Sequence, residues 1–133
     1  MTASQRRSRF IEADGCFNLR DLGGYRTGHG GTVAWRRLFR SDGLHRLTAT
    51  GQAAFGALGV ASVLDLRTPG EREQCPWAPP KGWSGRVVSL PLLPEVPDWS
   101  RADPTELERA DFAADHYLHI AEVGAGGLRT AVD

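Results

Sequence analysis

The hydrophobic pattern of the chain changes several times between the spacing typical of helices and that typical of strands. Small and apolar residues recur at helical spacing at Leu47, Gly51, Ala54, Phe55 and Leu58. Gly59 follows them, at the position where helices favour glycine, so a helix is expected to end there. Residues 60–66 are then almost wholly apolar, which is typical of a strand buried on both faces of a parallel sheet.

Two capping motifs predict further helices. Thr68 is followed by Pro69 and Glu71, which predicts a short helix that stops before Pro76. Asp103-Pro104-Thr105-Glu106 repeats this pattern and predicts a longer helix, broken by the glycines of residues 124–127. We expect that helix to bury one stripe of side chains: Leu107, Ala110, Ala114, Tyr117, Leu118 and Ala121.

Residues 32–40 and 86–90 have the bulky, β-prone composition of strands. The double glycines 23–24 and 30–31 predict turns with positive φ. Strands and helices therefore alternate, which favours an α/β layered domain over residues 14–133. Residues 1–13 are polar and rich in arginine, and we expect them to form a flexible N-terminal arm.

Length, charge and cysteine content narrow the class of protein. The chain has 133 residues, the size of one domain, and its sixteen basic residues balance sixteen acidic ones. A neutral chain is not typical of a nucleic-acid-binding protein. Its two cysteines are too few for a disulfide scaffold or a four-cysteine zinc site, and we expect no metal. No signal peptide or transmembrane segment is visible, so we expect a cytoplasmic location.

Three short polar segments are candidates for chemistry. Residues 18–25 (NLRDLGGY) place Arg20 and Asp21 beside a double glycine, and Arg40 begins an Arg-Ser-Asp segment after an apolar strand end. Asp65 and Arg67 end the most apolar strand, where ligands of open α/β sheets gather. Such a pair is suited to positioning a phosphate or donating a proton. A purely structural role is the alternative for each segment: a pinned turn, an ion pair closing a turn, or a strand-end cap.

Together and in this order, NLRDLGGY, LFRSDGLHRLT and LGVASVLDLRTPGERE resemble the N-terminal half of the bacterial tyrosine phosphatases that open with an N-x-R-D-x-G-G segment. The resemblance is close over residues 15–75 and otherwise follows the pattern of elements. It implies a three-layer α/β fold with a parallel-type sheet and flanking helices, incomplete at the C-terminus. It also implies cysteine-dependent hydrolysis of phosphate esters, without metal or cofactor, on a phosphorylated protein or a phosphoinositide.

The nucleophile of that family lies in an HC-x5-R loop, where backbone N–H groups and a helix N-terminus hold the phosphate and lower the thiol pKa. The chain departs from this pattern. Six residues after Cys16 stands Leu22, and six after Cys75 stands Lys81, reached through three prolines. We therefore expect an inactive chain that represents the N-terminal portion of such a phosphatase.

On the resemblance, Asp65 is the candidate catalytic residue, and Arg20, Asp21, Arg40 and Arg67 are candidates for substrate binding. Two alternatives stay open: a pseudophosphatase-like module that binds phosphoproteins through its arginines, and a structural fragment without independent function. A missing central strand would leave residues 60–66 with unpaired backbone groups, so we also expect self-association through an exposed sheet edge.

Overall fold

The computed structural model describes residues 8–109 and 111–132. The chain divides into two units: unit 1 comprises Met1–Val60 and Trp77–Trp83, and unit 2 comprises Ala61–Pro76 and Ser84–Asp133. Residues 1–7 of the predicted arm lie outside the described residues, whereas Phe10 and Ala13 form isolated β-bridges to Arg20 and Cys16.

Unit 1 is built around a short antiparallel sheet and one helix. Strand β1 (Arg20–Asp21) pairs with β2 (Phe39–Arg40), and the 3-10 helix η1 (Leu44–Arg46) leads into helix α1 (Ala49–Ala57). Its buried apolar side chains are Ala13, Cys16, Leu19, Leu47 and Phe55. The predicted strand over residues 32–40 is therefore mostly loop, because only its last two residues join the sheet.

The helix predicted over residues 47–58 is confirmed as α1. Its N-cap Thr48 accepts a hydrogen bond from the Gly51 amide, and Gly59 has a φ of +67° just after the C-cap. Gly51 lies against the carbonyl group of Asp14, where the Cβ of any other residue would overlap it. The helical spacing therefore includes a glycine because the neighbouring loop approaches the backbone closely.

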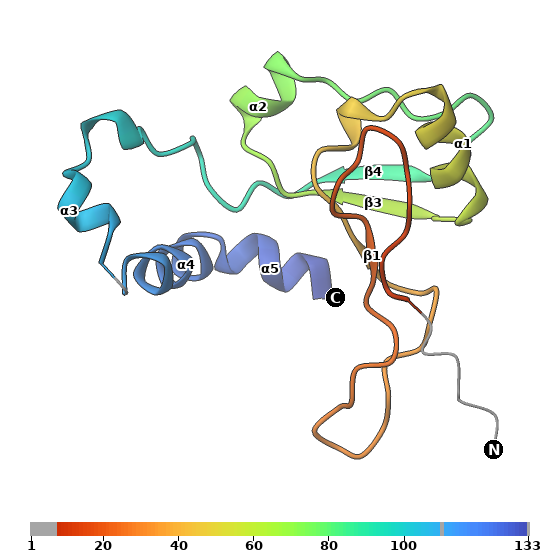
Figure 1. The fold of residues 1–133 in the computed structure, drawn as a ribbon, viewed down its shortest axis with the longest axis horizontal. Helices are drawn as coiled ribbons and strands as arrows, with labels where there is room; N and C mark the ends of the chain where they lie inside the picture. The colour runs from red at the N-terminus through yellow and green to blue at the C-terminus, as the bar shows by residue number, and fades with distance from the viewer. Residues whose placement is uncertain (1–7, 110, 133) are drawn as a thin grey trace. The chain divides into compact units, whose positions relative to one another are not determined.

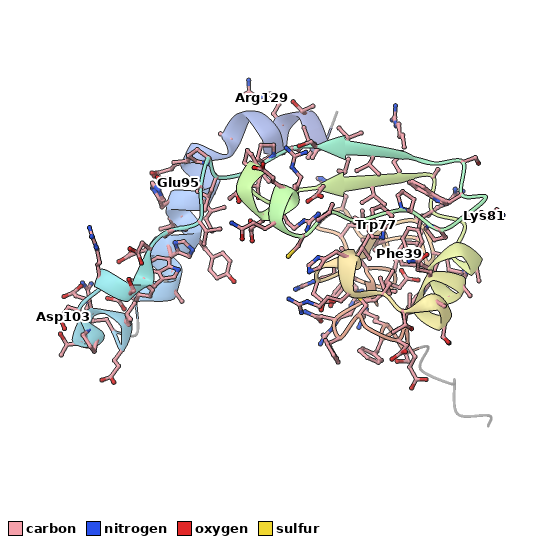
Figure 2. All side chains as sticks on the ribbon, turned by 90° about the horizontal axis from the view of Figure 1, so that it is seen from above. Phe39, Trp77, Lys81, Glu95, Asp103 and Arg129 are labelled. Carbon is pink, nitrogen blue, oxygen red and sulfur yellow. The ribbon has the colours of Figure 1, made fainter. Side chains whose placement is uncertain are left out.

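Two tryptophans pack the Trp77–Trp83 segment onto α1 within unit 1. The rings of Trp77 and Trp83 lie edge-on to Phe55, with centroids 5.5 and 6.0 Å away, and Figure 2 labels Trp77 in this cluster. The indole nitrogen of Trp83 donates a 2.6 Å hydrogen bond to the Val60 carbonyl. These contacts pack the loop of residues 77–83 onto the rest of unit 1.

Unit 2 contains a parallel pair of strands followed by helices. Strand β3 (Ser62–Asp65) pairs with β4 (Arg86–Ser89), in a register that sets Asp65 opposite Ser89, and the two strands lie side by side in Figure 1. Helix α2 (Pro69–Gln74) lies between them in the chain. After β4 come η2 (Trp99–Arg101), α3 (Pro104–Leu107), α4 (Phe112–Val123) and α5 (Ala125–Val132). The mixed α/β class predicted for the chain is confirmed.

Three predictions for unit 2 are wrong in detail. Leu64 of β3 is 41% exposed rather than buried on both faces, because the sheet formed by the described residues has only two strands. The long helix is divided, since the short α3 ends at Leu107 and α4 begins at Phe112. The predicted break at 124–127 holds only for Gly124, because the two later glycines lie inside α5.

The predicted stripe of buried side chains is also wrong. Tyr117 and Leu118 are 71% and 62% exposed, Ala114 and Ala121 are exposed, and Ala110 lies outside the described residues. The less exposed side chains of α4 are those of Phe112, His116 and Ile120, and the first two contact the ring of Trp99. The aromatic contact therefore sets which face of α4 is covered. None of the helices in the described ranges is long and apolar enough to cross a membrane.

We predict that Thr68→Ala destabilises unit 2. The Thr68 hydroxyl accepts a hydrogen bond from the Glu71 amide, and the Glu71 carboxylate accepts one from the Thr68 amide, so the predicted capping box is present. Loss of such a cap lowers the free energy of unfolding by about 1 kcal/mol. Urea denaturation measures this change, with the exposed Thr50→Ala in α1 as control. Equal effects of the two substitutions would contradict a specific role for the cap.

Candidate functional site

Asp65 and Arg67 form a bidentate ion pair at the carboxyl end of β3. The guanidinium Nε and Nη2 of Arg67 donate to the two carboxylate oxygens of Asp65 over 3.0 and 2.8 Å. The Arg67 amide also donates to Asp65 Oδ1 over 3.1 Å. The side chains are only 22% and 12% exposed, so solvent screens the pair weakly. The sequence motif therefore folds on itself into one rigid turn.

Arg67 also connects this turn to the far end of α2. Its Nη1 donates a 2.8 Å hydrogen bond to the carbonyl group of Cys75, the C-cap residue of the helix. At the near end of α2, the capping box joins Thr68 and Glu71. A single guanidinium thus fixes both the strand end and the helix end of this loop.

The ion pair sets the protonation state of Asp65. Partial burial alone would raise the pKa of Asp65, but the hydrogen bonds and charge of Arg67, with the charge of Arg72, together hold this pKa below its ordinary value. The carboxyl group is therefore ionised at neutral pH and is suited to holding a cation rather than to donating a proton. The pair stabilises the folded state at neutral pH, and this contribution is lost as the pH falls through the lowered pKa.

Asp21 organises the loop that follows β1. Its buried carboxylate accepts hydrogen bonds from the amides of Gly23 and Arg36, both over 2.8 Å. Arg36 has a φ of +61°, which is uncommon for a residue other than glycine, and the bond to Asp21 fixes its amide. Gly23 packs directly beneath the ring of Trp35, with no room for a Cβ. Asp21 therefore uses both carboxylate oxygens within the fold.

Arg20 and Arg40 lie directly opposite each other in the β1–β2 pair. Residues at opposite positions of an antiparallel pair project from the same face of the sheet, so both guanidinium groups lie on one face. Both residues are exposed, and within the described part of the chain neither side chain has a hydrogen-bond or ion-pair partner. Two cations on one face form a candidate site for an anion.

The structure thus brings the predicted site residues together in two groups. Arg20, Asp21 and Arg40 belong to unit 1, and Asp65 and Arg67 belong to unit 2. In each group an aspartate organises the local backbone. The groups differ in the state of their arginines, because Arg67 is held by its neighbours whereas Arg20 and Arg40 are exposed.

Sequence reasoning missed the role of Asp42. The structural alternative for residues 40–42 is an ion pair closing the turn, but Asp42 instead accepts hydrogen bonds from the Cys16 thiol over 2.8 Å and the Asn18 amide over 3.1 Å. Ser41 Oγ lies 3.1 Å from the same sulfur. No local pattern indicates this contact, because 26 residues separate Cys16 from Asp42.

This environment makes Cys16 a poor nucleophile. Burial, followed by the hydrogen bond to Asp42, raises the pKa of the Cys16 thiol. The pKa of Asp42 is lowered: partial burial opposes this change, and the hydrogen bond from the thiol and those from backbone amides outweigh it. A thiol that donates to an ionised carboxylate stays protonated, whereas a catalytic cysteine must lose its proton. Cys16 therefore acts as a structural donor.

Unit 2 also contains an apolar hollow of about 270 Å³, lined mainly by Leu66, Leu92, Trp99, His116 and Ile120. This lining is mainly apolar and contains no lysine or arginine that could hold a phosphate. Among residues 8–109 and 111–132, no group of three or more His, Cys, Asp or Glu side chains is placed to hold a metal ion.

Comparison with known proteins supplies the family. No curated protein matches the chain. The sequence model of the tyrosine phosphatase family matches residues 11–133, which include the loop after β1, the strand-end ion pair and all helices of unit 2. The chain belongs to the tyrosine phosphatase family.

Proposed function

We propose that this chain supplies the substrate-binding part of a cysteine-dependent phosphatase that hydrolyses phosphate monoesters. The observation that carries the proposal is the rigid Asp65–Arg67 turn at the carboxyl end of a parallel strand. Ligands of open α/β sheets bind at this end. The family match supports phosphatase-type chemistry, and phosphorylated substrates accord with it.

Asp65 and Arg67 have a positioning role in this proposal. Asp65 is already ionised and holds Arg67, which in turn fixes the loop ahead of α2. Arg20 and Arg40 contact the phosphorylated substrate, a protein or a phosphoinositide, and Asp21 supports them by fixing the loop after β1. Thiolate chemistry needs neither metal nor cofactor and requires a reducing compartment such as the cytoplasm.

A pseudophosphatase-like module that binds phosphoproteins is the second candidate. The specific observation in its favour is the state of Arg20 and Arg40, which are exposed and unpartnered within the described residues. Binding through these arginines requires no nucleophile.

We predict that the 133-residue chain does not hydrolyse para-nitrophenyl phosphate. Neither cysteine lies in an HC-x5-R loop, and the Cys16 thiol is held protonated by its surroundings. Release of nitrophenolate measures turnover, with Cys16→Ser and Cys75→Ser as the matched variants. Turnover that either substitution abolishes would refute the prediction. Turnover that persists in both would indicate chemistry independent of cysteine.

In a longer form that contains an HC-x5-R loop, Asp65→Asn and Arg67→Ala should each lower kcat/KM by at least about tenfold, the scale of groups that position reacting atoms. The pH–rate profile distinguishes the two roles of Asp65: a positioning carboxylate leaves the basic limb in place, whereas loss of a general acid removes it.

Glu73→Gln, an exposed carboxylate on α2, is the control for this experiment and should keep the wild-type rate. If Asp65→Asn and Arg67→Ala both fold normally and also keep that rate, the pair serves the fold alone.

We also propose that the chain self-associates through the β3–β4 sheet. Within the described residues the sheet has two strands, so each strand has an unpaired edge, and Leu64, Leu66 and Val87 are 41%, 43% and 45% exposed. Size-exclusion chromatography should give an apparent mass above 14.5 kDa that rises with concentration.

The variant Leu64→Lys should move this elution toward the monomer, because a charge on the sheet disfavours edge pairing. Leu118→Lys, on an exposed position of α4, is the matched control and should leave the elution unchanged. A wild-type monomer with slow amide exchange across residues 60–66 would contradict the proposal.

A further inference from the structure

The neutral chain divides into two units of opposite charge. Unit 1 contains ten basic and four acidic residues, a net charge of +6, and unit 2 contains six basic and twelve acidic residues, a net charge of −6. The overall balance therefore hides a strongly basic unit. Such a unit attracts anions over several ångströms, more strongly at low ionic strength.

Among the residues of unit 1 that the structure describes, no carboxylate forms an ion pair with an arginine. Asp14 accepts a hydrogen bond from the Thr48 hydroxyl, Asp21 binds backbone amides, and Asp42 binds a thiol and amides. In unit 2, by contrast, arginines pair with acidic residues: Arg67 with Asp65, Arg101 with Asp98, and Arg109 with Glu106 and Asp115. Three of the four carboxylates of unit 1 therefore accept hydrogen bonds from uncharged donors.

Two of these basic residues lie next to each other in the strand pairing, where Arg20 lies between Arg40 and Phe10. The register places Arg40 opposite Arg20 on one side, and a bridge places Phe10 opposite Arg20 on the other. All three side chains therefore project from the same face, while the neighbouring Leu19 and Asp21 are buried on the opposite face. Phe10 is 47% exposed, so the two guanidinium groups lie beside an apolar contact surface.

We propose that this row, Phe10–Arg20–Arg40, docks a phosphorylated polypeptide segment without hydrolysing it. The proposal rests on the proposed function for the assignment of Arg20 and Arg40 to substrate, and it adds a separate binding event that needs no cysteine. One guanidinium satisfies the two oxygens of a carboxylate. A phosphoryl group carries about −1.5 to −2 charges and three acceptor oxygens, so it matches two guanidinium groups side by side.

The surroundings favour a polypeptide over a free phosphate ion. Phe10 offers an apolar surface to a side chain next to the phosphorylated residue, and the net charge of unit 1 attracts acidic flanking residues. Two like charges at opposite strand positions are also unfavourable alone, and a dianion between them removes this repulsion. The row therefore gains both binding and local stability when the segment docks.

Fluorescence anisotropy with the full 133-residue chain tests the proposal. The probes are a short fluorescein-labelled peptide with one phosphoserine beside a leucine and two glutamates, and the same peptide with serine. We expect the phosphopeptide to bind at least about tenfold more tightly than its serine counterpart. Arg20→Gln and Arg40→Gln should each remove most of this preference. Arg20→Lys should also lose most of this preference, because lysine keeps the positive charge but lacks the planar guanidinium group that donates two parallel hydrogen bonds.

Arg37→Gln is the matched control, since it removes the same charge from an exposed position of unit 1 outside the row. It should change the affinity by less than about twofold, as expected for a screened surface charge. Circular dichroism confirms that each variant folds. An equal loss in Arg37→Gln, or equal binding of the two peptides, would overturn the proposal in favour of diffuse attraction.

Vesicles containing phosphatidylserine test whether the row binds a membrane surface instead of a polypeptide. Vesicle binding that depends on Arg20 and Arg40 and exceeds phosphopeptide binding would overturn the proposal, because the row would then face a membrane surface. Turnover is not measured in these experiments. The two proposals can therefore fail separately. If the chain binds the phosphopeptide but the substitutions in the longer form leave hydrolysis unchanged, the docking proposal stands and only the proposed function is wrong.

Discussion

The Asp65–Arg67 ion pair is the interaction on which the order of unit 2 depends. It uses one carboxylate to fix an arginine, and that arginine reaches the last turn of α2 through the Cys75 carbonyl. Without Arg67, the partly buried carboxylate of Asp65 would lose its charge partner and the C-cap carbonyl its donor, and such orphaned groups are unfavourable. The same pair lowers the pKa of Asp65, so the rigidity of the turn and the chemistry available to it have one cause.

Local signals in the sequence predicted the elements that depend on neighbouring residues. The helix end at Gly59, and the capping box of Thr68 and Glu71, follow from hydrogen bonds that span three or four residues. The Asp65–Arg67 contact is equally local, because a separation of two residues at a strand end is enough for a bidentate ion pair. Such features can be read from one sequence, since the chain brings the partners together whatever the rest of the fold does.

Contacts between distant segments could not be predicted in this way. The Cys16–Asp42 hydrogen bond has no local pattern, and the face of α4 that is covered depends on Trp99, which precedes that helix by a turn and a short helix. Helical spacing predicted one buried face, and Tyr117 and Leu118 on that face proved to be exposed. Hydrophobic periodicity identifies a helix more reliably than it identifies the partner that covers it.

The distribution of charge also depends on which segments the fold brings into the same unit. A count over the whole sequence gives zero, whereas the division into units separates six excess positive charges from six excess negative ones. The separation matters because the aspartates of unit 1 are used as hydrogen-bond acceptors for its loops, which leaves the Arg20–Arg40 pair without a counter-ion among the described residues. In unit 1, therefore, the carboxylates that stabilise the loops face amide and thiol donors, whereas Asp65 of unit 2 accepts a backbone amide and also pairs with Arg67.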